Sequence, residues 1–154
     1  MGAKVKNPRK KFLWSIMFPK HPINTYLFQS CTLPDIEIDQ VAHGDVNRDV
    51  KTAGRVTIGN LIVEKLMTTA GSDTWLHDWL YACQDHIVGG GLVPSQYWET
   101  AIVNELAEDG VSVLNTHLFE EVWPCKVNGQ ELDRMASENS IESIEFSVGT
   151  ADKY

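Results

Sequence analysis

Short segments in which apolar and polar residues alternate run along most of the chain, and this period of two predicts β-strands. Residues that favour turns separate these segments, and the clearest hairpin signal is Glu108-Asp109-Gly110. Gly59 and Asn60 interrupt one of the longer segments. The expected strands are residues 12–18, 25–28, 35–39, 56–69, 98–106, 111–119, 122–127 and 141–148.

One segment has helical spacing instead. Between residues 72 and 87 apolar side chains recur at spacings of one, three and four, which places them on a single stripe of an α-helix. Ser72 or Asp73 can cap its first turn, and residues 89–91, all glycine, end it. The fold class is therefore mainly β with one packed α-helix. The stripe consists of Trp75, Leu76, Trp79, Leu80, Cys83 and Ile87.

A row of acidic residues lies on one face of the strand expected at residues 35–39. Asp35, Glu37 and Asp39 alternate with Ile36 and Ile38, so we expect one half-buried face and one wet face. Alternate residues are about 7 Å apart along a strand, within the Debye length at moderate salt, so the carboxylates repel one another modestly. The row is either an ordinary solvated face or a surface kept hydrated and negative for a function.

Residues 43–54 are mostly polar and predict a long loop, which in a small domain is either mobile or used for contact. No repeat or linker divides the chain. We expect a basic N-terminal arm at residues 1–11, one domain at residues 12–148 and a C-terminal tail at residues 149–154.

The net charge of −8 is unevenly distributed along the 154 residues. Residues 1–20 hold six of the 13 basic residues and no acidic residue, so the remainder carries 7 basic and 21 acidic residues. This acidic remainder of the chain repels phosphate groups, which argues against a protein that recognises DNA sequence. The arm is either a solvated terminus or a segment that docks on an acidic neighbouring subunit. Its basic residues are Lys4, Lys6, Arg9, Lys10 and Lys11.

The apolar runs are too short to cross a bilayer, and no secretory leader follows the basic start, so we expect a protein made and assembled in a cytoplasm. No nucleophile elbow, phosphate-binding glycine loop or zinc motif is present. On the expected helix, His77 and His86 fall on opposite faces and cannot join Cys83 in one metal site. We therefore expect no enzyme, no metal and no cofactor.

Three cysteines, Cys31, Cys83 and Cys125, lack paired spacing, so free thiols are expected, with one bridge between subunits as the alternative. Trp75, Trp79, Trp98 and Trp123 are surrounded by few basic residues. Base-stacking surfaces normally lie in a positive groove, so we assign these rings to core packing.

Four blocks, in this order, resemble the tail-tube family of contractile phages, whose fold is similar to that of pyocin and type VI secretion tubes. The resemblance spans about residues 12–148. The blocks are Leu33-Pro34-Asp35-Ile36-Glu37-Ile38; residues 61–67; Trp75-Leu76-His77-Asp78-Trp79; and Phe119-Glu120-Glu121-Val122-Trp123-Pro124-Cys125-Lys126 followed by Ile141-Glu142-Ser143-Ile144-Glu145-Phe146.

The resemblance implies a β-barrel or sandwich whose strands are shared across subunits to line a tube lumen. It further implies hexameric rings stacked helically inside a sheath, with baseplate and tail terminator proteins as partners. DNA would pass through the lumen without sequence-specific binding, and the acidic row is our candidate for the lumen face. The protein would belong to the virion. The residues expected to connect one ring to the next are Asp45, Asn47, Arg48, Asp49 and Lys51.

Two alternatives remain at this point. A tube of a type VI secretion or pyocin-like system shares the implied fold. A small acidic binding module that works as a monomer belongs to another class and would form neither rings nor tubes. Within the tube family the loop after the acidic strand is usually more glycine-rich, whereas here it carries Arg48, Asp49 and Lys51, which suggests a more ionic stacking contact.

Overall fold

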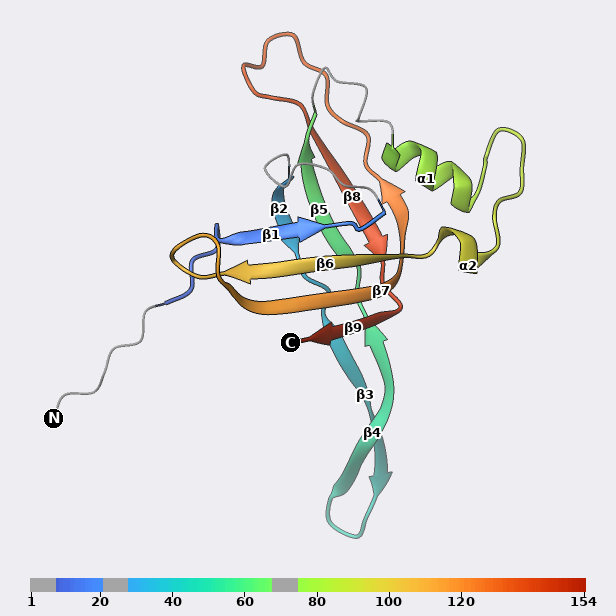
Figure 1. Ribbon diagram of the computed structural model, residues 1–154. Coiled ribbons are helices and arrows are strands. Elements are labelled where there is room, and N and C mark those ends of the chain that lie inside the picture. The colour runs from blue at the N-terminus through green and yellow to red at the C-terminus, as the bar shows by residue number, and fades with distance from the viewer. Residues whose placement is uncertain (1–7, 21–27, 68–74) are drawn as a thin grey trace, which may run out of the picture.

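The computed structural model describes residues 8–20, 28–67 and 75–154. Strands dominate, as the alternation predicts, and two short helices follow β5 and precede β6 along the chain (Figure 1). The elements are β1 (Trp14–Met17), β2 (Phe28–Thr32), β3 (Ile36–Gly44), β4 (Asp49–Ile58), β5 (Leu61–Leu66), α1 (Trp75–Cys83), α2 (Pro94–Tyr97), β6 (Glu99–Leu106), β7 (Val113–Val127), β8 (Ile141–Ser147) and β9 (Thr150–Lys153).

The long strand β7 belongs to two sheets. Its first half pairs with β6 on one side and β9 on the other, and β6 pairs in turn with β1. Its second half pairs with β8, followed by β5 and β2. Glu121, with a positive φ of 55°, lies between the two halves. In Figure 1 the strands of the two sheets run in different directions, and the sheets join along β7.

The core fills the space between these sheets and α1. Inward side chains from both sheets meet Leu76 and Trp79 of α1, which are buried. The ring centroids of Phe18 and Phe146 are 5.3 Å apart, and the Trp79 indole N–H donates to the carbonyl of Tyr97 over 2.8 Å. Core packing of the tryptophans is confirmed for Trp79, and in part for Trp75 and Trp123, which pack against the core half-buried. Trp98, by contrast, is 37% exposed.

The helix is shorter than its apolar stripe predicts. α1 ends at Cys83, and the segment to Ile87 is not helical. The Asp85 carboxylate accepts hydrogen bonds from the amides of Ile87 and Val88, so a turn replaces the expected last helical turn. Ile87 is consequently exposed. The proposed caps Ser72 and Asp73 lie outside the described residues.

Most expected strands are confirmed, with differences at their ends. The two strands expected at residues 111–119 and 122–127 form one continuous strand, β7. Residues 150–153, assigned to the tail, form β9 and pair with β7. Of the strand expected at residues 25–28, only Phe28 is described, and it begins β2.

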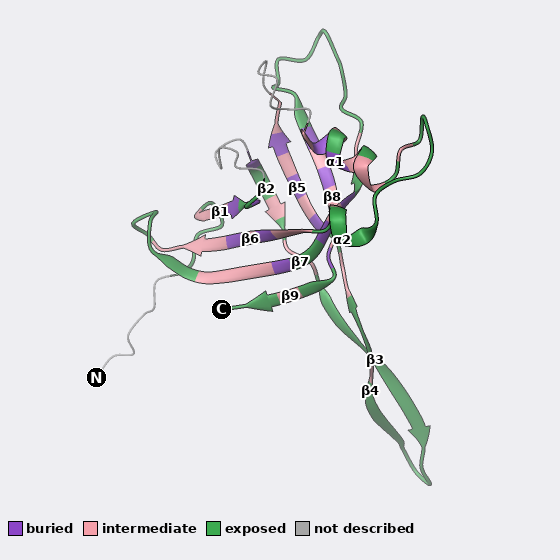
Figure 2. Ribbon diagram, turned by 45° about the vertical axis from the view of Figure 1, so that its right-hand side comes forward, coloured by how far each residue is buried: buried purple, intermediate pink, exposed green. Residues whose placement is uncertain are grey.

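The prediction of a long loop at residues 43–54 is wrong. β3 and β4 pair along a hairpin from Ile36 opposite Ile58 to Gly44 opposite Asp49. Only residues 45–48 form the turn between the two strands. The hairpin continues the β2–β5 pair and extends well beyond the body of the molecule (Figures 1 and 2).

Candidate assembly surface

The β3–β4 hairpin is the most exposed regular structure in the described chain. Every residue of β3 is exposed, and only Gly54 and Ile58 of β4 are half-buried. Figure 2 shows both strands as an exposed ribbon that projects away from the buried body. An isolated two-stranded hairpin is marginally stable in water. The described part of the chain does not cover either face of this ribbon.

The acidic row lies near the base of this hairpin. Glu37 and Asp39 share one face of β3, and Asp35 directly precedes the strand. The expected half-burial of the opposite face is wrong for the single chain, because Ile36 is 59% and Ile38 54% exposed. The alternation is present, but no other described part of the chain covers its apolar side.

The residues predicted to connect rings are divided between the turn and a strand. Asp45, Asn47 and Arg48 lie in the turn, where the Asp45 amide donates to the Arg48 carbonyl over 2.8 Å. Asp49 and Lys51 instead belong to β4, opposite Gly44 and Ala42. The turn nevertheless places all five residues at the far end of the hairpin.

The sheet formed by β1, β6, β7 and β9 has two open edges. Within the described residues, β1 pairs only with β6 and β9 only with β7. Tyr154 and Thr116 exchange both backbone hydrogen bonds, at 2.8 and 3.0 Å. In an antiparallel ladder the neighbouring residue then points its N–H the other way, so Lys153 directs its amide away from β7, where it donates to the Asp152 carboxylate over 2.8 Å.

The described part of the N-terminal arm is anchored on its own chain. Arg9 Nη1 lies 2.7 Å from Glu105 Oε2, which also accepts a 2.9 Å hydrogen bond from the Asn115 amide. The Asn115 hydrogen bond is the main cause that holds the pKa of Glu105 below its usual value, and His117 and Arg9 lower it further. Lys4 and Lys6 lie outside the described residues.

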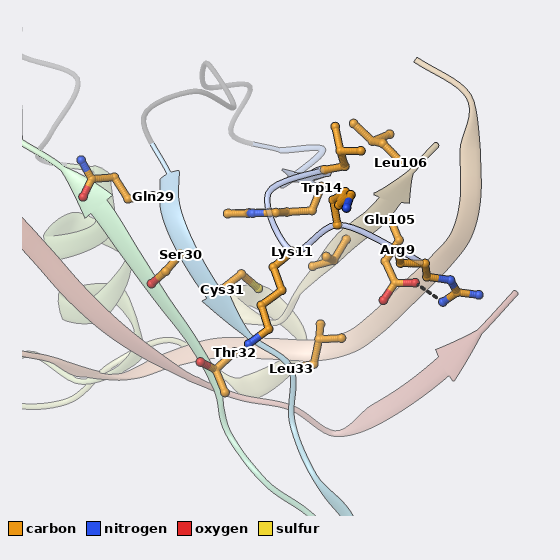
Figure 3. Close-up of a pocket in the computed structure, with 13 residues that line it drawn as sticks. Arg9, Lys11, Trp14, Gln29, Ser30, Cys31, Thr32, Leu33, Glu105 and Leu106 are labelled. Carbon is orange, nitrogen blue, oxygen red and sulfur yellow. Dashed lines mark hydrogen bonds and ion pairs between the residues drawn. The ribbon is translucent and has the colours of Figure 1, made fainter. Parts of the chain in front are cut away.

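A cavity of about 700 Å³ opens between this arm and the edges of β1 and β2 (Figure 3). Lys10 and Lys11 contribute to its lining together with apolar residues such as Trp14 and Leu33. Lys11 extends across the opening toward Thr32 in Figure 3. The arm therefore brings positive charge to the open end of the core.

The cysteines are free thiols in three different environments. Cys31 and Cys83 are half-buried, and burial raises the pKa of Cys31 to about 12 and that of Cys83 to about 11. Cys125 is exposed, with its sulfur 3.3 Å from the Glu145 carbonyl. Across residues 8–20, 28–67 and 75–154, no three His, Cys, Asp or Glu residues gather as metal ligands, and no helix could span a bilayer.

The arrangement consists of open sheet edges, a projecting hairpin and an anchored arm, which are features of a subunit built to contact other subunits. Residues 10–150 match the family model described as T4-like virus tail tube protein gp19. The chain belongs to this tail tube family. Tail tube protein gp19 of Enterobacteria phage T4 is 27% identical over 127 residues, covering 80% of this chain and 77% of that protein. The T6 protein is 26% identical over the same shares.

Solved structures show the same fold beyond phages. The tube-terminating cap of the anti-feeding prophage superposes with a TM-score of 0.82 at 15% identity, over 100% of this chain and 95% of that chain. A chain of the sheath–tube complex of an extracellular contractile injection system gives a TM-score of 0.78 at 16% identity, over 97% and 93%. A type six secretion system protein gives 0.57 at 11% identity, over 91% and 81%.

The family decides between the functions that the sequence left open. The chain is a structural component of a contractile phage tail, located in the virion, and it is not an enzyme. The resemblance and the mainly β tail-tube fold are confirmed. Open strand edges are a signal that sequence reasoning missed, because β9 falls in residues that were assigned to a tail.

Proposed function

We propose that copies of this chain close into hexameric rings that stack helically into a tail tube, through which DNA passes during ejection. In this assembly the sheet of β1, β6, β7 and β9 continues from subunit to subunit, and the β3–β4 hairpin connects one ring to the next. The tube encloses a lumen and performs no bond chemistry.

The direction of the strands is the observation that supports ring closure most directly. All neighbours in this four-stranded sheet are antiparallel, so β1 and β9 run in opposite directions. When β9 of one copy lies beside β1 of the next, the new pair is therefore also antiparallel. Both strands have four residues, so their edges match in length. Head-to-tail pairing of this kind removes open edges when the ring closes.

The hairpin is the element best suited to ring stacking. It projects beyond the body, and its far end carries Asp45, Asn47, Arg48, Asp49 and Lys51, which offer charges of both signs. Near its base, the carboxylates of Asp35, Glu37 and Asp39 lie opposite the apolar side that Ile36 and Ile38 form. When that apolar side packs on a neighbour, the acidic row faces the lumen and repels the DNA phosphates.

The basic arm provides a further contact between subunits in this proposal. Arg9 is held by Glu105 of its own chain, and this anchor fixes where the arm leaves the body. Lys10 and Lys11, together with Lys4 and Lys6, are then available to an acidic neighbour.

Sheath, baseplate and terminator proteins complete the proposed set of partners. Chains with this fold come from a sheath–tube complex, a sheath/tube terminator and a baseplate of contractile injection systems. The outer surface of the tube would meet the sheath, and its two ends would meet the baseplate and the terminator.

Negative-stain electron microscopy of the purified protein tests assembly. Six-fold rings or tubes are expected, and a persistent monomer of 17.3 kDa at high concentration would contradict the proposal. On pairing, the Lys153 amide would exchange its bond to the Asp152 carboxylate for one to the neighbouring β1. Lys153→Pro removes this outward N–H of β9 without removing a ladder bond to β7, and proline is tolerated on an edge strand. Rings should be lost in this variant and retained in the matched control Lys153→Ala. If Lys153→Pro forms normal rings, the pairing of β9 with β1 is wrong.

Stacking is tested separately by shortening the hairpin. Val41 and Thr52 are directly opposite each other and form a hydrogen-bonded pair by the alternation from Asp45 and Arg48, so residues 42–51 can be replaced by an Asn-Gly turn that suits a two-residue hairpin. Rings are expected to form and tubes to be absent. Tubes that grow at the normal rate would show that the far end of the hairpin does not connect rings.

A further inference from the structure

The apolar side chains of the hairpin change face part-way along its length. In β3, Ile36 and Ile38 share one face. Val41 comes three positions after Ile38, and this odd spacing places it on the other face. A strand with one buried face would keep its apolar residues at even spacing. β3 therefore presents Ile36 and Ile38 on one side and Val41 on the other.

β4 makes the same change at the same level, by means of a bulge. Val56 and Val50 are an even number of residues apart and would share a face in a regular strand. The register, however, moves from Ile38 opposite Val56 to Gln40 opposite Ala53, so β4 contains one extra residue between these pairs. The extra residue transfers Val50 to the face of Val41.

Gly54 makes room for this bulge. A Cβ atom at this position would lie 3.0 Å from the Asp39 carbonyl oxygen and 3.2 Å from a methyl group of Val41. The change of face is thus built into both strands, at Asp39 in β3 and at Gly54 in β4. It produces a base patch, made of Ile36, Ile38 and Val56, and a tip patch, made of Val41 and Val50.

Both patches are open in the single chain. The base patch residues are 54–59% exposed and the tip patch residues 42–43% exposed. A neighbour that packs on one face of a two-stranded ribbon leaves the other face in water. Covering both patches therefore requires contacts from two sides of the hairpin.

We infer that two further copies of this chain pack against each hairpin, one on the base patch and the other on the tip patch. This inference rests on the proposed tube. A copy of the chain suits the tip patch because the far end of the hairpin carries the exposed acidic residues Asp45 and Asp49, and each copy carries the exposed basic residues Lys10 and Lys11. Glu37 and Asp39, nearer the base, stay open to the lumen. The hairpin would then join three subunits rather than two.

Photo-crosslinking in doped tubes tests this arrangement. The crosslinking amino acid p-benzoylphenylalanine is placed at Ile38, at Val50 or at both positions of a tagged subunit. The tagged subunit is mixed with a large excess of unlabelled protein, assembled, irradiated and analysed on a denaturing gel. Because labelled subunits are diluted, each tagged product reports the neighbours of one hairpin.

Each singly labelled subunit should give a covalent dimer, and the doubly labelled subunit should also give a trimer. The trimer fraction should equal the product of the two single yields, and peptide mapping should locate both partners on this chain. Dimers alone from the doubly labelled subunit, or no product from intact tubes, would overturn the inference. Crosslinks to another protein, seen only in sheathed tails, would also overturn it. If unlabelled protein forms no tubes, the proposed function itself fails, which is a separate result.

Discussion

Glu142 is a buried carboxylate on β8, and we expect its replacement to destabilise the fold strongly. It is 4% exposed and lies directly opposite Lys65 of β5, which is fully buried. His77 of α1 lies 3.1 Å from the same carboxylate through its Nε2 atom. Glu142→Gln keeps the shape of the side chain but removes the negative charge opposite the Lys65 ammonium.

Opposite charges on directly facing residues of neighbouring strands contribute about 0.2–1 kcal/mol, and a buried polar group that loses its partner costs about 1–3 kcal/mol, so we expect a loss of about 1–3 kcal/mol. That is a large fraction of the total stability of a small domain, roughly 5–15 kcal/mol. The contact with His77 adds little, because that side chain is 45% exposed and such pairs contribute about 0–1 kcal/mol. The expected loss therefore comes mainly from removing a buried charge that faces the buried Lys65 across the two strands.

Urea unfolding of the unassembled protein, followed by circular dichroism, measures this loss from the midpoint at constant slope. Glu145→Gln is a matched control on the outer face of the same strand, where the Lys126 ammonium is 3.7 Å away, and it should cost under about 1 kcal/mol. The double variant Lys65→Met with Glu142→Leu should lose less than either single variant, because no buried charge remains. Additive losses in the double variant would refute the coupling.

Three further outcomes are expected. Because the pKa of Glu105 is lower in the folded protein than in the unfolded chain, its ionised carboxylate stabilises the fold. This contribution is complete above the ordinary pKa of 4.5 and is lost as the pH falls through the lower pKa of the folded state. Unfolding curves of the wild type and Glu105→Gln should therefore converge in acid and separate near neutral pH. Gly91→Ala should destabilise by about 1–3 kcal/mol, because its Cβ would meet the carbonyl oxygen that ends α1, whereas Gly129→Ala, in open space, should be neutral. At pH 8, mass spectrometry after treatment with iodoacetamide should find Cys125 alkylated before Cys31, whose pKa of about 12 keeps it protonated; the reverse order would contradict this burial.

The body of the fold was largely predictable because its alternation reflects a real core. Residues such as Val63, Ile144 and Phe146 are buried at every second position, as the pattern requires. The end of the helix was not predictable in this way. Ile87 fits the apolar spacing, but the amides of Ile87 and Val88, which a last helical turn would use, donate to the Asp85 carboxylate instead. Spacing reports which residues could share a stripe, and local side-chain hydrogen bonds decide where the helix stops.

The candidate site was predictable only in part, and for a different reason. The acidic row and the residues of the far end were identified, but the hairpin that holds them was assigned to a loop. Its strands have few apolar residues, and the bulge at Gly54 breaks the alternation in β4. In the proposed tube, neighbouring subunits cover this ribbon, so its strands need not show the alternation of a strand that packs on its own core.

The division between body and hairpin has a consequence for how substitutions act. Core residues lie in the two sheets and α1, and none of the buried residues belongs to β3 or β4 among the described positions. Changes to exposed hairpin residues such as Val41 and Val50 should therefore leave the unfolding free energy of the single chain nearly unchanged. In the proposed tube, their cost should appear only on assembly, when neighbouring copies bury their surface. The stability of the monomer would then not depend on the contacts that build the proposed tube.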